Sequence, residues 1–296
     1  MRFCRNYGKV SWPNKALHLT GRALRNVPMQ IVELHFRRRP TCDYAAVKAR
    51  AQEILESELD CPDPSAADKA FLIVHKNYPV KYTDGQVPAQ TAILATDQPP
   101  MLEAYQQDIQ QSWRCRRAEE LLRACKETRL VTEMMARLLS QQDRVSLFHG
   151  VLRAMIEVTK PDALVFKHSQ QVIEPADYLA ACDQDPIMRP GSLNVRFFNI
   201  SNSDGEMLMD TRGLAEVGLH DLQCHFRGLD PKEVARVLLN TAVYIFEQGP
   251  VIESGQTVAG VEPDSKWRCQ FENSLLEPKR ELLDLNPGKP YAAGGR

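Results

Sequence analysis

Cys224 and His225 stand next to each other, and a thiol with a neighbouring base could act as a nucleophile pair. The surrounding residues, 222–226, alternate in the manner of a β-strand. Successive side chains of a strand point to opposite faces, so these two residues cannot share a proton. We therefore interpret Cys224 as a buried thiol and His225 as a surface residue, and we predict no catalytic residue.

A metal site would need convergent ligands, and the best candidates are His220, His225, Asp210 and Asp221. Their spacing matches no ligand pattern such as HExxH. The segment 183–185 (Asp-Gln-Asp) begins like a calcium loop but lacks the glycine at the sixth position and the closing glutamate. GxGxxG, GxxxxGK[ST] and GxSxG are also absent from the sequence. We expect neither a metal nor a cofactor.

Polar residues at the ends of apolar strands form the remaining catalytic candidates. They are His75, Lys76, Lys167, His168 and Asp210. Strand ends can line a site, and an enzyme of unrecognised class built from these residues is the alternative function. The ordinary interpretation of such residues is a solvated strand end.

The stretch Gln111-Ser112-Trp113 and the pair Met134-Met135 suggest an adaptable apolar binding patch. A core cluster that holds a helix to a sheet is the competing interpretation. Between them, residues 114–126 form a predicted helix rich in arginine, with Glu119 and Glu120 interleaved. We interpret this helix as a solvated face with ion pairs rather than an RNA-binding surface.

Charge argues against a nucleic-acid partner. Residues 1–39 hold nine Lys or Arg and one acid, Glu33, which leaves 28 basic and 37 acidic residues after position 39, a balance of −9. An acidic body is a poor match for a phosphate backbone and could instead attract a basic protein. An RNA-binding sheet face would also need exposed aromatics, for which Phe197 and Phe198 are the best pair.

The elements that would position these residues alternate between strands and helices. Strands are predicted at 30–36, 71–75, 90–95 and 129–135, and helices at 44–55, 102–111 and 114–126. This is the β-α-β-β-α-β order of a ferredoxin-like fold. We expect an antiparallel sheet with helices on one face and the other face open.

A second half with the same order is traced over residues 163–260. It has strands at 163–167, 194–200, 206–209 and 222–226, with a hairpin turn at Asp204-Gly205 and helices at 175–181 and 231–248. A helix capped by Asp143 and stopped at Lys160-Pro161 joins the halves. We predict an α+β fold with a disordered or non-native leader at 1–28, a first half at 29–140, and a second half with a C-terminal tail at 141–296.

Several segments resemble a bacterial family known only as domain of unknown function 4261 (DUF4261). The matching text is QSW at 111–113, LVTEMMARLL at 130–139, ALVFKHSQQVIEP at 163–175, MDTRGLAEVGLHDLQCHF at 209–226, the helix ending AVYIFEQG, and LDLNPGKPYAAGGR at 283–296. The resemblance covers nearly everything after Met29. It implies a bacterial protein, loosely associated with toxin–immunity neighbourhoods, and it carries no activity or site residue.

Composition completes the prediction. No apolar run approaches a membrane span, and the eight cysteines contain no CxxC spacing, so we expect reduced cysteines and a cytoplasmic location. The function predicted is a non-catalytic, immunity-like protein that binds a basic, toxin-like protein partner.

Overall fold

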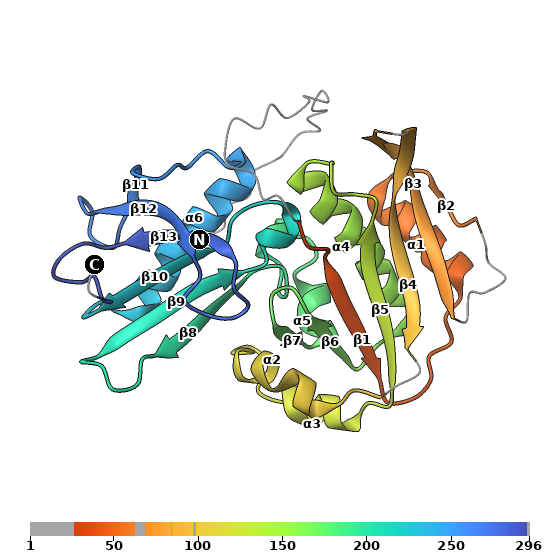
Figure 1. Cartoon of the computed structure of the whole chain (residues 1–296). Coiled ribbons are helices and arrows are strands. Elements are labelled where there is room, and N and C mark those ends of the chain that lie inside the picture. The colour runs from red at the N-terminus through yellow and green to blue at the C-terminus, as the bar shows by residue number, and fades with distance from the viewer. Residues whose placement is uncertain (1–26, 63–68, 84, 97–98, 295–296) are drawn as a thin grey trace.

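The computed structural model describes residues 27–62, 69–83, 85–96 and 99–294. The chain folds into two β-sheets that lie side by side, each with helices packed on it (Figure 1). The α+β class predicted from the sequence is therefore confirmed. Residues 1–26, which make up most of the predicted leader, lie outside the described residues.

The first sheet contains seven strands within the described residues, all antiparallel to their neighbours. Their spatial order is β2 (Leu59–Asp60), β3 (Ala70–Tyr82), β4 (Gly85–Thr96), β5 (Glu127–Met134), β1 (Ile31–Phe36), β6 (Ala163–Phe166) and β7 (Gln171–Ile173). One face carries a large apolar core formed with α1 (Tyr44–Leu55), α4 (Gln141–Thr159) and α5 (Pro175–Ala180).

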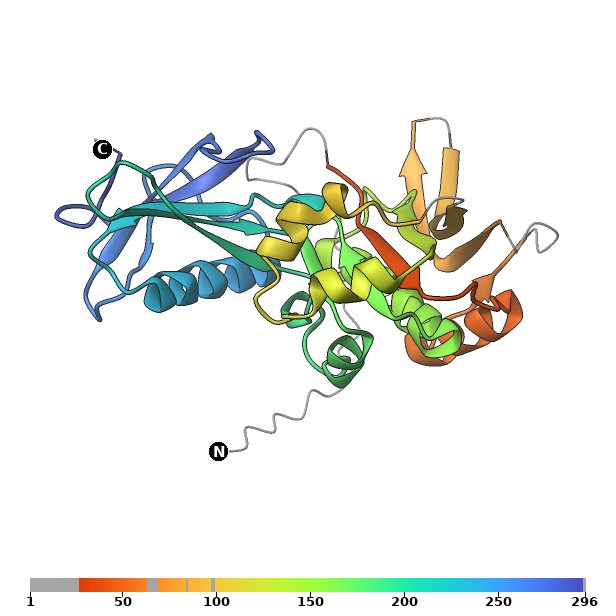
Figure 2. The same ribbon diagram turned by 90° about the horizontal axis from the view of Figure 1, so that it is seen from below.

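Helices also lie on part of the opposite face, over β1, β6 and β7. There η2 (Leu102–Tyr105), α2 (Gln106–Gln110) and α3 (Ala118–Ala124) pack on β6 and β7 through a smaller apolar cluster, and the Tyr105 hydroxyl of η2 donates to Glu33 of β1 at 2.7 Å. Figure 2 shows the yellow α2–α3 segment in the middle of the molecule, where the two sheets meet. Helices on one face only, as predicted, are therefore not confirmed for this sheet.

The ferredoxin-like order is not confirmed either. A split βαβ unit keeps its two crossover-linked strands parallel, with another strand between them. Here β1 pairs with β5 and β6, and three antiparallel steps separate β1 from β3, so β1 and β3, the strands predicted to be parallel partners, run in opposite directions. Most of the predicted strands form, and strands joined by a short turn pair as predicted, but the pairing of strands far apart in the sequence differs from the prediction.

The second sheet has six strands in the described part of the chain. Their order is β11 (Thr257–Ala259), β12 (Lys266–Asn273), β13 (Glu281–Asn286), β10 (Leu222–Arg227), β9 (Glu206–Arg212) and β8 (Asn194–Asn199). The β10–β13 pair is parallel and the others are antiparallel, so this sheet is mixed. Helix α6 (Pro231–Gln248) packs its apolar stripe on this sheet.

Local signals fix the ends of the two long helices. Asp230 caps α6 by accepting a hydrogen bond from the Lys232 N–H at 2.9 Å, as the sequence predicts. The predicted cap of α4, Asp143, is corrected to Ser140, whose Oγ accepts the Asp143 N–H at 3.1 Å. The Ser140 hydroxyl in turn donates to the Asp143 carboxylate, which explains why the acid looked like the cap.

The second sheet begins later in the chain than the boundary predicted at 140/141. Helix α4 and strands β6 and β7 belong to the first sheet and its core, and the second sheet starts at β8. Just after β9, Gly213 packs against the segment that leads into β8. It has a φ of +127°, and a Cβ there would lie 2.1 Å from the Ser192 carbonyl oxygen. Only glycine fits so close to the neighbouring backbone.

Candidate functional site

The strand-end residues do not gather at one place. His75 is buried in β3, its Nε2 lies 2.9 Å from Thr91 Oγ1, and burial lowers its pKa to about 4. Lys76 is exposed and pairs with Glu58 at 2.8 Å. Both belong to the far side of the first sheet, away from β6 and β9.

His168 and Lys167 follow β6 and also have partners of their own. Burial lowers the pKa of His168 to about 4, and its Nδ1 lies 3.3 Å from the Ile31 carbonyl oxygen. Lys167 Nζ lies 3.8 Å from Asp108 Oδ2 and over the Tyr105 ring. Burial raises the pKa of Asp108 to about 6.

The cysteine and histidine candidates separate as strand geometry requires. Cys224 is buried, and burial raises its thiol pKa well above the ordinary value. His225 Nε2 instead lies 3.1 Å from Glu206 Oε2, and His220 Nε2 lies 3.2 Å from Glu281 Oε2. The thiols of Cys115, Cys125, Cys182 and Cys269 are likewise buried, with raised pKa values. Among the described residues, no group of three or more His, Cys, Asp or Glu could hold a metal ion.

A serine–histidine–tyrosine cluster was not predicted from the sequence. Ser192 Oγ donates to the Pro186 carbonyl at 2.6 Å, so it accepts from His149 Nε2 at 3.2 Å, and His149 Nδ1 accepts from the Tyr178 hydroxyl at 2.8 Å. Burial holds the pKa of His149 well below its usual value. Because the serine proton is committed to a carbonyl inside the protein, this cluster fixes packing rather than activating a nucleophile.

Asp210 and Asp221 belong to a buried ionic network on the second sheet. The Arg196 guanidinium makes two hydrogen bonds to Asp210, at 2.8 and 2.5 Å, and both side chains are fully buried. Arg280 donates to Asp210 at 2.9 Å and to Asp221 at 3.0 Å. Desolvation of this kind is tolerated because each charge has an opposite charge and hydrogen bonds.

Two arginines of the second sheet also bond it to the first sheet, at the turn between β6 and β7. Arg196 donates to Gln170 Oε1 at 2.7 Å, and Arg212, at the end of β9, donates to the His168 carbonyl at 3.0 Å. Asn194 donates to the Ser169 carbonyl at 3.0 Å. The predicted aspartate candidates therefore work as a joint between the sheets.

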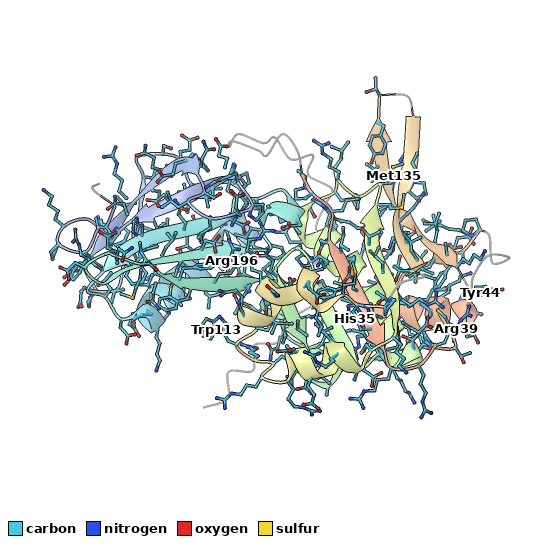
Figure 3. All side chains as sticks on the ribbon, turned by 60° about the horizontal axis from the view of Figure 1, so that its bottom comes forward. His35, Arg39, Tyr44, Trp113, Met135 and Arg196 are labelled. Carbon is cyan, nitrogen blue, oxygen red and sulfur yellow. The ribbon has the colours of Figure 1, made fainter. Side chains whose placement is uncertain are left out.

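The Gln111-Ser112-Trp113 corner closes the neighbouring edges of both sheets. Gln111 Oε1 accepts the Phe197 N–H of β8 at 3.3 Å, and Ser112 Oγ accepts the Val172 N–H of β7 at 2.7 Å. Trp113 comes next and is 61% exposed. Met135 is also exposed but lies elsewhere, on the other side of the first sheet (Figure 3), so the predicted patch of Trp113 with Met134 and Met135 does not form.

The phenylalanines and arginines considered for RNA binding contact other parts of the protein. Phe197 packs against the core of the second sheet, whereas the Arg196 guanidinium lies 5.4 Å from the centre of the Phe198 ring. Arg117 pairs with Glu120 and Arg123 with Glu119, as a solvated face predicts. The two phenylalanines thus do not form one stacking platform.

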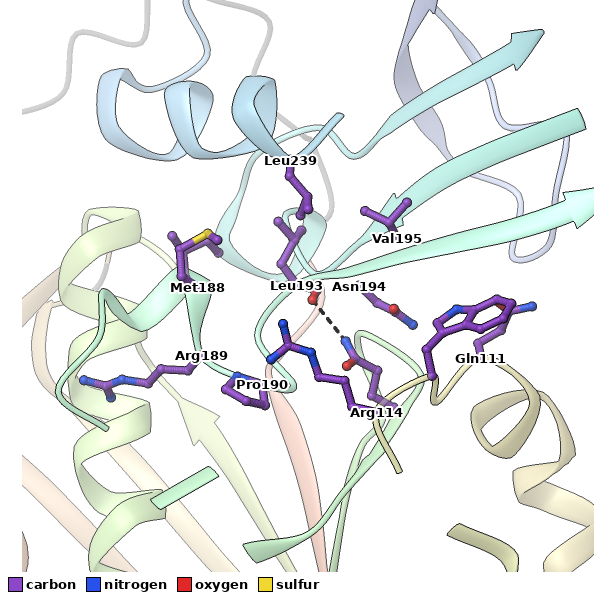
Figure 4. Close-up of a pocket in the computed structure, with 12 residues that line it drawn as sticks. Gln111, Arg114, Met188, Arg189, Pro190, Leu193, Asn194, Val195 and Leu239 are labelled. Atoms are coloured by element: carbon purple, nitrogen blue, oxygen red, sulfur yellow. Dashed lines mark hydrogen bonds between the residues drawn. The ribbon is translucent and has the colours of Figure 1, made fainter. Parts of the chain in front are cut away.

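A small pocket lies beside Trp113, where the two sheets meet (Figure 4). Its volume is about 160 Å³. Twelve residues from β7, β8, α6 and the segments that connect the two sheets line it: Gln111, Trp113, Arg114, Gln171, Ile187, Met188, Arg189, Pro190, Leu193, Asn194, Val195 and Leu239. The Gln171 side chain spans the joint by donating to the Leu193 carbonyl at 3.0 Å. Aromatic and apolar walls with a few amides suit binding better than acid–base chemistry.

These features define an α+β protein with two sheets, a charged joint and an exposed tryptophan beside it. Residues 210–286 match the family described as Domain of unknown function (DUF4261). The resemblance drawn from the sequence is thereby confirmed over these residues, which run from the end of β9 to β13. No curated protein and no solved structure matches the chain. None of the described helices is long and apolar enough to span a membrane.

Proposed function

We propose that this is a non-catalytic, immunity-like protein of the bacterial cytoplasm that binds a protein partner through Trp113 and the adjoining pocket. The observation that carries the proposal is the exposure of Trp113, 61%, at the rim of a pocket built from both sheets. Large exposed aromatics beside pockets are typical anchors of protein interfaces. Met188, 43% exposed, extends the same surface.

The enzyme alternative has less support. Each strand-end residue makes a hydrogen bond or an ion pair with a different partner, and none of them lines the pocket beside Trp113. The polar groups that do line it are amides and two arginines, Arg114 and Arg189. Such groups orient a bound surface but provide no base.

Charge supports a basic partner at long range. The balance of −9 after residue 39 would speed the encounter with a positively charged protein, and salt would weaken that effect. The pocket itself is not acidic, so the attraction would come from the body as a whole. A basic toxin-like protein fits this description.

The test is affinity purification from the native host with three baits: the wild-type protein, Trp113→Ala and Met101→Ala. Met101 is the matched control, because its side chain is 62% exposed but lies outside the pocket. We expect one partner to be recovered with the wild type and Met101→Ala, and to bind Trp113→Ala about thirtyfold more weakly. Recovery of no partner, or equal binding by all three baits, contradicts the proposal.

A further inference from the structure

Strand β11 forms an outer edge of the second sheet, opposite the edge at β8 (Figure 1). It pairs with β12 in a register that places Val258 opposite Trp267. The Cys269 N–H donates to the Gln256 carbonyl at 2.8 Å, and the Gly260 N–H donates to the Ser265 carbonyl at 2.9 Å. The Gly255 N–H also donates to the Cys269 carbonyl, at 2.8 Å, and from Gln256 to Gly260 it is the even-numbered residues that bond to β12.

Antiparallel pairing alternates, so the odd-numbered residues of β11 direct their backbone groups away from β12. The N–H and C=O groups of Thr257 and Ala259 thus point away from β12, in the plane of the sheet and beyond its edge, and both residues are exposed. The same alternation on β8 leaves Phe197 pointing outward, and its N–H is the one that Gln111 accepts. No described strand pairs with the outer side of β11.

A groove runs between β11 and α6. Its volume is about 1110 Å³, and its walls include Asn240 and Tyr244 of α6 and residues 256–263. Val237 and Ile252 form part of its floor and also belong to the core of the second sheet. The groove is therefore the open end of that core, at the place where the sheet ends.

Two apolar side chains remain exposed along the groove. Tyr244 is 49% exposed and Val251 is 46% exposed. The Val258 side chain lies on the same face of the sheet as its buried partner Trp267, so it points toward the core. A strand added beside β11 would place an apolar side chain next to Val258 and over these residues.

We propose that the β11 edge and this groove form a second binding site, which takes an extended segment of a partner polypeptide by strand addition. The unpaired backbone groups of Thr257 and Ala259 select an extended chain, because only such a chain presents donors and acceptors at matching spacing. The groove selects apolar residues at alternate positions. This site is separate from the pocket at Trp113 and does not depend on its function.

The probe is a displayed library of random peptides about ten residues long, selected on the full-length protein. We expect enrichment of sequences with β-branched or aromatic residues at alternate positions. Ala259→Pro deletes one outward N–H and should weaken an enriched peptide about tenfold. Tyr244→Ala, which leaves the strand unchanged, should also weaken it by a similar factor.

Gln270→Ala is the matched control, because it changes an exposed side chain of the neighbouring strand β12, outside the groove, and keeps the outward backbone groups of β11. Its peptide affinity should equal that of the wild type. Hydrogen exchange on the wild-type complex gives a readout without mutation: the amides of Thr257 and Ala259 should become protected when peptide is bound. Failure to enrich any peptide, or enriched peptides that bind all variants equally and leave these amides unprotected, overturns the proposal.

Discussion

The two edges of the second sheet are treated differently by the rest of the chain. At β8, the Gln111 side chain accepts an outward N–H, and Asn194 and Arg196 hold the turn between β6 and β7. At β11, the outward groups of Thr257 and Ala259 face solvent beside a groove. The β8 edge is closed because side chains and backbone of the first sheet bond to it, whereas the outer side of β11 has no described strand beside it and is the edge that we propose for another chain.

Asp210→Ala tests the closed edge with the largest expected effect. The substitution leaves the fully buried Arg196 without its carboxylate, and we expect the free energy of unfolding to fall by about 3–5 kcal/mol. Urea denaturation measures it. The control is Asp204→Ala, on the exposed turn between β8 and β9, which should change stability by less than about 0.5 kcal/mol. A loss below about 1 kcal/mol for Asp210→Ala would show that the joint does not depend on this ion pair.

A direct comparison of the two edges comes from Gln111→Ala and Thr257→Ala. Removing the Gln111 amide leaves the Phe197 N–H without its acceptor, so we expect a loss of about 1–2 kcal/mol. Thr257→Ala removes only an exposed side chain and should cost less than about 0.5 kcal/mol. Equal losses, measured as shifts of the urea midpoint, would remove the distinction between the edges.

Glu216→Gln adds a test of the buried charges around Asp221, because its effect on stability depends on pH. Burial, with Asp221 nearby, raises the pKa of Glu216 from 4.5 to about 7, and its Oε2 has no hydrogen-bond partner among the described residues. A carboxyl with a raised folded pKa contributes stability that is present below 4.5 and is lost as pH rises through about 7. Glu216→Gln lacks this loss, so its stability relative to the wild type should rise across that window, by up to about 1.4 kcal/mol per pH unit.

The measurement is urea denaturation of both proteins near pH 5 and near pH 8, with Asp204→Ala as a surface control. Parallel pH profiles for Glu216→Gln and the wild type would mean that Glu216 stays ionised in the joint. The three charges that face this carboxyl most strongly are Asp221, Arg212 and Arg280, and each remains in the variant.

Locally encoded features, including the hairpin of β8 and β9 at Asp204-Gly205, could be predicted from the sequence, whereas the pairing of strands far apart in the chain could not. Asp230 and Pro231 define the start of α6 without reference to the rest of the chain. The pairing of β1 with β5 joins residues about a hundred positions apart, its pairing with β6 joins residues about 130 apart, and neither leaves a local pattern. The segment 266–273 carried a usable signal, because Trp267 and Cys269 alternate with exposed residues, but no strand was predicted there.

The site shows the same limit. Gln111, Ser112 and Trp113 stood out in the sequence as an apolar patch, yet two of them proved to be hydrogen-bond acceptors for edge strands. That role depends on β7 and β8 arriving at the same corner, which only the fold reveals. Asp210 was selected for its chemistry, and the structure explains it by the arginines that surround it.

Amide hydrogen exchange of the unbound protein tests the contrast between the edges most directly. Both the Phe197 and the Ala259 N–H groups point outward from edge strands, but only the first has a side-chain acceptor. We predict that Phe197 exchanges at least about tenfold more slowly than Thr257 and Ala259. Equal protection of all three amides would show that β11 is already closed and would contradict the account.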